Sequence, residues 1–462
     1  MTKPEVDPEA YLKNWVSLDA KDYLDFLKAH WGTDQLASIL KPDKPLVERF
    51  LSITQTDVLD LIKAYPSDTS FFLRKEYALF IDRLTNAWTE KGKTRMHGCL
   101  LLGQPAIGKT CFLLFFLIHC LSRQETVLFT TSSGRTFLFH SQGVSTIKTS
   151  DFTACLHLPP RDYNAGPFWS LVDCPDKKEP IASSVTYGTR RLFFVVAVSP
   201  DESRYKLMAE CPTIRSYWMS RWSAEELVAL WTSIRPTNIA PEQTTRYKLS
   251  PGREFDLSTV NSLISDVGPC PQDILSHLRS PDNHRESVDR AIGHYTSDIF
   301  SIDHLLSHPD ALSNQHSHKI VLVSRVGGTA GQDTLEVDVD DRFIVRFKTL
   351  DIFKMLHTHL LSIEVDATRA LFMICKGLGP GSGTIFASFL FEGLAILFTR
   401  GLIPLNSDHP AFHPLILMDP VDPPPPPPQK AKPPRAQKAK TTYRFVYTVQ
   451  ASNMISSRNC HN

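Results

Sequence analysis

The sequence predicts an α/β fold in which a parallel β-sheet is covered by helices. From residue 97 onward, short apolar runs alternate with helical segments, the pattern of parallel strands joined by crossover helices. A glycine-rich motif at residues 103–110 lies between the first such strand and the first such helix. Residues 168–172 and 192–198 are almost wholly apolar, as strands buried on both faces of a sheet must be. We therefore expect a core domain over residues 93–235.

The region before this core is expected to be helical. Residues 8–92 carry apolar side chains at spacings of three and four, for example Tyr23, Leu24 and Leu27. The same spacing over residues 71–88 predicts the helix that leads into the core. Residues 1–92 are thus predicted to form a helical N-terminal region.

Within the core, each element follows from its local pattern. The strands are expected at 99–102, 126–130, 168–172 and 192–198, with an inserted hairpin at 135–140 and 144–147. An apolar helix is expected at 109–121, directly after the glycine-rich motif. Ser223 is expected to begin another helix, because Glu225 and Glu226 in its first turn complement the positive end of the helix dipole.

Beyond the core, the pattern predicts four further regions. Residues 236–310 read as a helical bundle, including helices at 260–267 and 271–278. Residues 311–418 read as a mixed α/β region with strands at 320–323 and 343–347 and helices at 350–361 and 386–398. Residues 419–441 form a proline-rich basic linker, and 442–462 a terminal strand and tail.

Composition excludes several classes of protein. The 50 basic and 49 acidic residues give a net charge of +1, so no global charge favours nucleic acid or membrane surfaces. No signal peptide or apolar stretch of membrane-spanning length is found, which predicts an intracellular protein of the cytoplasm or nucleus without a membrane partner. The nine cysteines include no C-x-x-C pair, and the pairs His316/His318 and His357/His359 lack partners at metal-ligand spacing.

The residues at 103–110 match the phosphate-binding pattern G-x-x-x-x-G-K-[ST] at every fixed position. The glycines let backbone N–H groups point at phosphates, Lys109 would hold the β and γ phosphates, and Thr110 would ligate Mg²⁺. ATP is the expected nucleotide, with GTP also compatible because the loop contacts only phosphates. The loop residues predicted to bind it are Gly103, Gln104, Pro105, Ala106, Ile107, Gly108, Lys109 and Thr110.

A carboxylate at the end of a neighbouring strand should complete the magnesium site. Asp173 is favoured for that role, with Asp201 after the next strand as the alternative. Hydrolysing enzymes of this type commonly carry a glutamate after the aspartate, whereas this chain has Cys174, so Asp176 or Glu179 would have to orient the attacking water. Ser199 is expected either to sense the γ-phosphate or to be a simple turn residue.

These motifs, with the segments 198–206 and 222–227, resemble fungal proteins similar to the Crinkler and retrotransposon hot spot families, over about residues 70–280. The resemblance implies an ATPase core of the additional-strand type, related to AAA+ and signal-transducing NTPases, in which residues 236–310 form a lid. It also implies an effector-like or mobile-element-related role. In such proteins the lid often offers an arginine to the nucleotide, where this chain has Gln272, a neutral amide.

The leading functional hypothesis is a Mg-ATP-binding switch or weak ATPase, whose flanking domains contact a protein partner. A non-hydrolysing nucleotide-binding interaction protein is the alternative, and a small-molecule kinase is less favoured because no arginine-rich phosphate lid is found. The six prolines at 423–428 would suit a proline-reading partner. Nucleic-acid binding is the less favoured interpretation of the basic linker residues, which are Lys430, Lys432, Arg435, Lys438 and Lys440. The acidic residues Glu336, Asp338, Asp340 and Asp341 are interpreted as a solvated strand and turn.

Overall fold

A computed structural model describes most of the chain up to residue 363. The residues it describes are 10–33, 35–39, 45–53, 58, 70–89, 96–158, 168–174, 183–186, 192–199, 202–233, 239–247, 249, 255–296, 302, 304–306, 316–325 and 343–363. The chain divides into two compact units, Met1–Leu356 and His357–Asn462. Almost all the described residues belong to the first unit, to which the following description applies.

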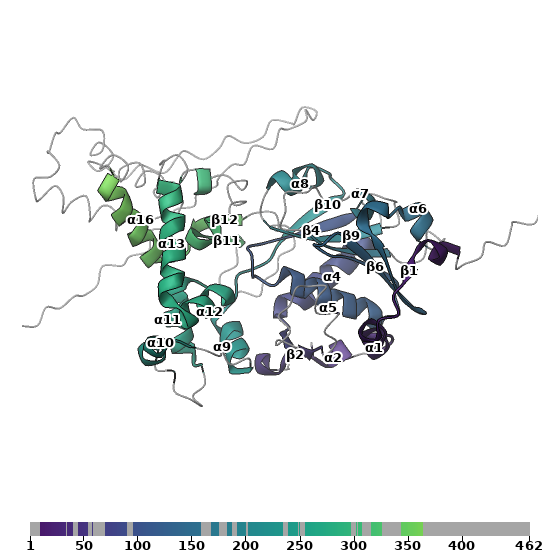
Figure 1. The fold of residues 1–462 in the computed structure, drawn as a ribbon, viewed down its shortest axis with the longest axis horizontal. Coiled ribbons are helices and arrows are strands. Elements are labelled where there is room, and N and C mark those ends of the chain that lie inside the picture. Colours follow the sequence, from purple (N-terminus) through teal and green to yellow (C-terminus); the bar gives the residue numbers. More distant parts are fainter. Residues whose placement is uncertain are drawn as a thin grey trace, which may run out of the picture. The chain divides into compact units, whose positions relative to one another are not determined.

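The centre of the first unit is a mixed sheet of mostly parallel strands, which confirms the α/β class (Figure 1). The order is β1-β7-β6-β5-β8-β9-β4-β10, with β5, β8, β9, β4 and β10 parallel and the remainder antiparallel. The strands are β1 (Val16–Ser17), β4 (Gly98–Leu102), β5 (Val127–Thr130), β6 (Arg135–His140), β7 (Gly143–Lys148), β8 (Phe168–Asp173), β9 (Leu192–Val198) and β10 (Ile214–Trp218). One consequence is that β9 separates β4 from β8.

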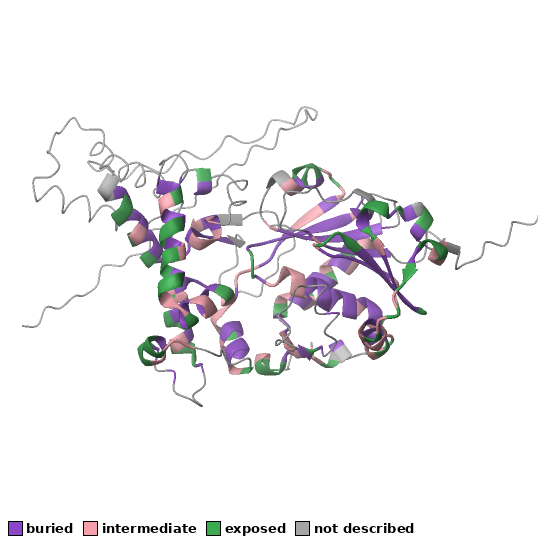
Figure 2. Ribbon diagram, in the orientation of Figure 1, coloured by how far each residue is buried: buried purple, intermediate pink, exposed green. Residues whose placement is uncertain are grey.

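Helices cover both faces of this sheet, as burial of its apolar strands requires (Figure 1). On one face, α5 (Lys109–Ser122) packs against β5, β8 and β9, and α4 (Lys75–Thr89) and α1 (Lys21–His30) pack against α5. On the other face, α7 (Ser183–Thr186) contacts β8 and β9, and α8 (Glu202–Ala209) contacts β10. Figure 2 shows α5 buried along most of its length, which explains why its sequence is apolar on all sides.

The N-terminal region is less helical than its spacing predicts. β1 adds an antiparallel strand to the main sheet at β7, and a separate two-stranded sheet pairs β2 (Phe50–Ser52) with β3 (Ser70–Phe72). The helix expected from residue 71 therefore begins only at Lys75, because residues 70–72 hydrogen-bond as a strand. The short elements η1 (Ala10–Asn14), α2 (Gln35–Ile39) and η2 (Leu46–Glu48) complete the region.

The hairpin β6–β7 and the helices after the core agree with the prediction. The predicted core region ends with α9 (Ala224–Ser233), and the predicted bundle region contains α10 (Pro241–Arg246), α11 (Leu257–Val267), α12 (Pro271–Arg279) and α13 (Pro281–Thr296). Short pieces pack at the edge of the core: η3 (Thr149–Asp151) and α6 (Ala154–His157). The strand β10 was not predicted, because Arg215 and Ser216 interrupt its apolar run.

The expected strands at 320–323 and 343–347 are present as an antiparallel pair, β11 (Val321–Arg325) and β12 (Phe343–Phe347), after the short α15 (Ser317–Ile320). α16 (Leu350–Ile363) agrees with the helix expected at 350–361. The predictions for 386–398, the acidic residues 336–341, the proline-rich linker 419–441 and the tail 442–462 lie outside the described residues. No helix among the described residues is long and apolar enough to cross a bilayer.

Candidate functional site

The glycine loop, defined as residues Gly103–Thr110, connects β4 to α5 at the carboxyl edge of the parallel strands. Its two glycines have backbone φ angles of 152° and 105°, which side-chain-bearing residues rarely adopt. A Cβ on Gly108 would collide with the Tyr77 hydroxyl, which donates a 2.8 Å hydrogen bond to the Gly108 carbonyl. A Cβ on Gly103 would lie 3.1 Å from Ile107. Both glycines are therefore required by the shape of the loop.

The two polar residues at the end of the loop have defined partners. The Lys109 ammonium donates to the backbone carbonyls of Gly103 at 2.5 Å and Gln104 at 2.8 Å, so it extends back across the loop. The Thr110 hydroxyl donates a 3.0 Å hydrogen bond to a carboxylate oxygen of Asp173, the last residue of β8. Because β9 lies between β4 and β8, this contact crosses the width of one strand. It brings together the two residues predicted to ligate a metal.

The other predicted site residues have mixed outcomes. Ser199 follows β9 and therefore lies at the carboxyl edge between the loop and Asp173, where its hydroxyl accepts a 3.3 Å hydrogen bond from Arg204. Cys174 is buried, and its backbone N–H donates to Ala197. Asp176, with Glu179 and Asp201, lies outside the described residues.

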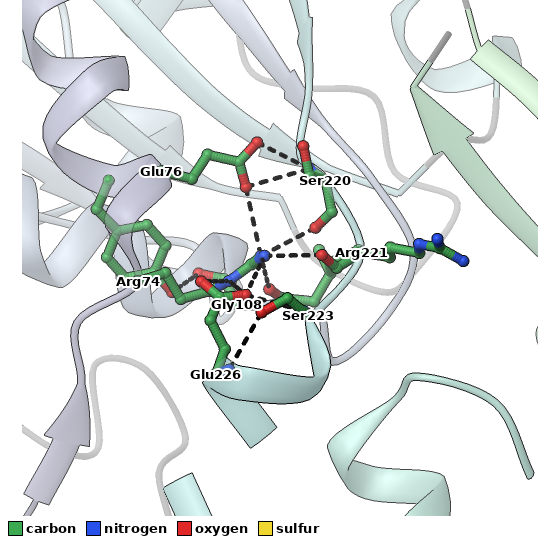
Figure 3. Close-up of polar contacts among 9 residues, drawn as sticks. Arg74, Glu76, Gly108, Ser220, Arg221, Ser223 and Glu226 are labelled. Atoms are coloured by element: carbon green, nitrogen blue, oxygen red, sulfur yellow. Dashed lines mark hydrogen bonds and ion pairs between the residues drawn. The ribbon is translucent and has the colours of Figure 1, made fainter. Parts of the chain in front are cut away.

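A buried arginine, Arg74, that was not predicted from the sequence hydrogen-bonds to the backbone of the glycine loop (Figure 3). The Arg74 side chain is only 2% exposed, and its guanidinium donates to the carbonyl of Ile107 in the loop at 3.1 Å. It also donates to the carbonyls of Ser220 and Arg221, in the segment between β10 and α9, both at 3.0 Å. One side chain thus connects the glycine loop to the segment that leads into the helical bundle.

Two carboxylates neutralise Arg74. Glu226 of α9 accepts from Nε and Nη2 of Arg74, at 3.0 Å for the closest pair, and Glu76 lies 3.4 Å away. Glu226 and Ser223 also cap α9 reciprocally, with both hydrogen bonds at 3.1 Å. Burial by itself lowers the pKa of Arg74, but Glu226 and Glu76 raise it above its usual value. The sequence suggests only the dipole role of Glu226, because its partner lies 152 positions away.

The segment from α15 to β12 also contacts the loop. The Gln104 side chain is buried and donates a 2.6 Å hydrogen bond to the carbonyl of Val321, the first residue of β11. His318 lies close by: burial, followed by the charges of Lys109 and Lys348, lowers its pKa to about 3. The imidazole is therefore neutral at physiological pH. The loop thus has neighbours that come from far along the chain.

The same segment is joined to the helical bundle by a buried ion cluster. Asp273 of α12 accepts hydrogen bonds from Lys319, at 2.7 Å, and from Lys348. Burial alone would raise the pKa of Asp273, but the two ammonium groups lower it well below its usual range. Gln272, at the position where related lids offer an arginine, is exposed. The two cations that pair with Asp273 therefore come from residues after position 316.

The donor set at Thr110 and Asp173 fits a magnesium–nucleotide complex. Mg²⁺ bound with a nucleotide typically takes one or two protein oxygens, with phosphates and water as its other ligands. A hydroxyl and a carboxylate 3.0 Å apart beside a glycine loop match that requirement. Among the described residues, no group of three or more His, Cys, Asp or Glu side chains is placed to hold a metal ion on its own.

Comparison with known proteins gives no assignment. No protein-family model matches the chain, and no curated protein matches it. The resemblance to the Crinkler and retrotransposon hot spot families stays a prediction from the motifs, and function has to be argued from the geometry.

Proposed function

We propose that this chain binds a nucleoside triphosphate, ATP by preference, together with Mg²⁺ at the glycine loop. The hydrogen bond from Thr110 to Asp173 is the observation that carries the proposal. In a glycine turn without a phosphate-binding role, a contact between the last hydroxyl of the turn and a carboxylate on β8, across β9, would not be expected. The sheet order supports the same assignment, because a strand inserted between β4 and β8 is the arrangement of additional-strand P-loop NTPases.

Each residue of the site would have a distinct role in binding Mg²⁺ and the nucleotide. The backbone N–H groups of the glycine loop, with the positive end of α5, would bind the phosphates. Lys109 would move from the loop carbonyls to the β and γ phosphates, and Thr110 and Asp173 would hold Mg²⁺. Bound there, Mg²⁺ would neutralise charge on the phosphate oxygens. Ser199, which follows β9 between the loop and Asp173, would contribute a hydroxyl toward the phosphates.

The biological consequence we propose is a nucleotide-dependent switch with slow hydrolysis. Arg74 joins the loop to the residues before α9, so a shift of the Ile107 carbonyl on nucleotide binding would be transmitted toward the helical bundle. The alternative is a nucleotide-binding protein that does not hydrolyse. Cys174 favours it, because a buried thiol stands where a water-orienting glutamate is usual and cannot act as a base.

The test is calorimetric titration of the full chain with ATP and GTP, with and without Mg²⁺. Lys109→Ala should weaken binding by about tenfold to a hundredfold, the range of a lost charge-assisted hydrogen bond. Asp173→Asn should weaken binding only when Mg²⁺ is present. Lys28→Ala, a change at an exposed lysine of α1, is the matched control and should bind like the wild type.

Two results would decide between the hypotheses. If the wild type binds neither nucleotide, the proposal is wrong. If it binds, phosphate release from ATP separates the two versions: turnover that disappears in Lys109→Ala supports the slow ATPase, and its absence in the wild type supports the non-hydrolysing protein.

A further inference from the structure

Two arginines near the glycine loop have no acidic partner among the described residues. Arg221 lies between β10 and α9, and Arg346 is the last residue but one of β12; both side chains are half-buried. Among the residues that the structure describes, neither guanidinium makes an ion pair or a hydrogen bond, although the backbone carbonyl of Arg221 accepts from Arg74. A partly desolvated cation without a counter-ion lowers the stability of the folded protein. Two such cations near one loop therefore suggest that they have a role in binding.

Arg221 is held beside the loop by its own backbone. The Arg74 guanidinium donates at once to the carbonyl of Arg221 and to the carbonyl of Ile107, so a single planar group spans the two segments. In Figure 3 the Arg221 side chain extends away from this cluster, leaving Arg74 to Glu226 and Glu76. The cation of Arg221 is therefore not part of the Arg74 network.

Arg346 belongs to the strand pair β11–β12, which also contacts the glycine loop. In the β11–β12 pair it stands opposite Leu322, and the adjacent Val321 accepts the 2.6 Å hydrogen bond from Gln104 of the loop. Val345 and Phe347 are buried, and strand alternation places Arg346 on the opposite face from them. β12 is thus one strand removed from a direct contact with the loop.

The two guanidinium groups interact with each other. Burial lowers the pKa of both arginines, and the charge of Arg221 lowers the pKa of Arg346 further. The neighbouring lysines differ, since Lys319 and Lys348 share the carboxylate of Asp273. Two like charges that influence each other and have no acid among the described residues are a suitable receptor for an oxyanion, and arginine binds phosphate oxygens in a bidentate manner.

We propose that Arg221 and Arg346 together bind a phosphoryl group, namely the terminal phosphate of the triphosphate on the glycine loop. This inference rests on the proposed nucleotide binding and deepens it. The pair would supply the positive charge that the exposed Gln272 cannot. It would do so from the segment between β10 and α9 and from β12, rather than from the lid. It would make the site prefer a triphosphate to a diphosphate.

The experiment compares three titrations of the full chain with Mg²⁺: the β,γ-imido analogue of ATP, ADP, and ADP with excess inorganic phosphate. Arg221→Gln and Arg346→Gln should each weaken binding of the triphosphate analogue by about tenfold to a hundredfold. Binding of ADP should change by less than about twofold. Arg290→Gln, at an exposed position on α13, is the control and should leave the ratio unchanged.

The outcomes separate the sources of the anion and the two proposals. If inorganic phosphate tightens ADP binding in the wild type but not in the arginine variants, the pair binds a phosphoryl group whether or not it is attached to the nucleotide. An unchanged ratio of analogue to ADP affinity in both variants overturns the inference alone. If the wild type binds no nucleotide, the proposed function fails, and pyrophosphate titrated against wild type and variants decides the arginine pair: equal binding overturns it.

Discussion

Two arginine environments near the glycine loop have opposite characters. Arg74 is buried and its guanidinium is fully used: three backbone carbonyls, the carboxylate of Glu226 and the nearby Glu76 surround it. Arg221 and Arg346 are half-buried, and in the described part of the chain their guanidinium groups contact no acid. An arginine guanidinium thus has all its partners within the protein at position 74, but has no described acidic partner at positions 221 and 346.

The difference distinguishes an arginine that stabilises the fold from arginines that are available to bind a ligand. A buried cation that already has all its hydrogen-bond partners fixes the backbone around it and has no capacity left for a ligand. A cation held near a loop without an anion retains that capacity, at a cost to the stability of the fold. Residues that bind ligands are commonly left unsatisfied by the protein itself. Each prediction below tests this distinction, in order of expected effect.

The largest effect is expected for Arg74→Met. The substitution preserves much of the apolar stem but leaves Glu226 and Glu76 buried without a counter-charge, which should cost about 3–5 kcal/mol of the free energy of unfolding. Urea denaturation followed by tryptophan fluorescence measures it, with Trp222, whose ring lies 4.8 Å from the Arg74 guanidinium carbon, as a local reporter.

Arg246→Met is the matched control for that measurement. Arg246 pairs with Asp266 at 2.6 Å, but its side chain is 54% exposed, so the loss should be below about 1 kcal/mol. Equal losses for the two variants would contradict the role of Arg74 as a buried anchor.

The second prediction concerns Asp273, whose paired lysines contrast with the unpaired arginines nearby. Asp273→Asn leaves Lys348 buried without a carboxylate and should cost about 3 kcal/mol at neutral pH. The pKa of Asp273 is lowered in the folded protein, so its contribution is fully present above the usual value of 3.8 and is lost as the pH falls below it. The difference in unfolding free energy between wild type and variant should therefore shrink below about pH 4.

Chemical denaturation between neutral pH and pH 3 provides this comparison. His284, whose pKa burial lowers to about 4, and His318 titrate in the same interval. The charge of Asp273 opposes the lowering of both pKa values, so its removal adds a smaller contribution from these histidines to the difference. A difference that stays constant with pH would show that the pKa of Asp273 is the same in the folded and unfolded protein, which would contradict its pairing with the two lysines.

The smallest effect on stability is expected at the unpaired arginines. Arg346→Gln removes a partly desolvated charge that has no described counter-ion, so the free energy of unfolding should be unchanged or rise by up to about 1 kcal/mol. Thermal unfolding without nucleotide measures it. A loss as large as that of Arg74→Met would mean that Arg346 supports the fold and that the comparison fails.

Much of the fold follows from short-range patterns. The strands β8 and β9 and the helix α5 are mostly apolar, as segments buried at the centre of a parallel α/β fold are. The glycine loop and the candidate metal ligand Asp173 were likewise predicted, because the spacing of the motif and the end of a strand are local features. The strand β3 was missed in favour of helix, since Phe71 and Phe72 fit both periods.

The rest of the site depends on pairs that are far apart in the sequence. No local pattern connects Arg74 to Glu226, Gln104 to Val321, or Arg221 to Arg346, since each pair forms only when separate elements pack. The sequence by itself determined the α/β class, the glycine loop and the carboxylate at the end of β8, because these depend on residues adjacent in the chain. Only the tertiary structure decided which charges are neutralised and which stay open, because burial and counter-ions are set by the packing of distant segments.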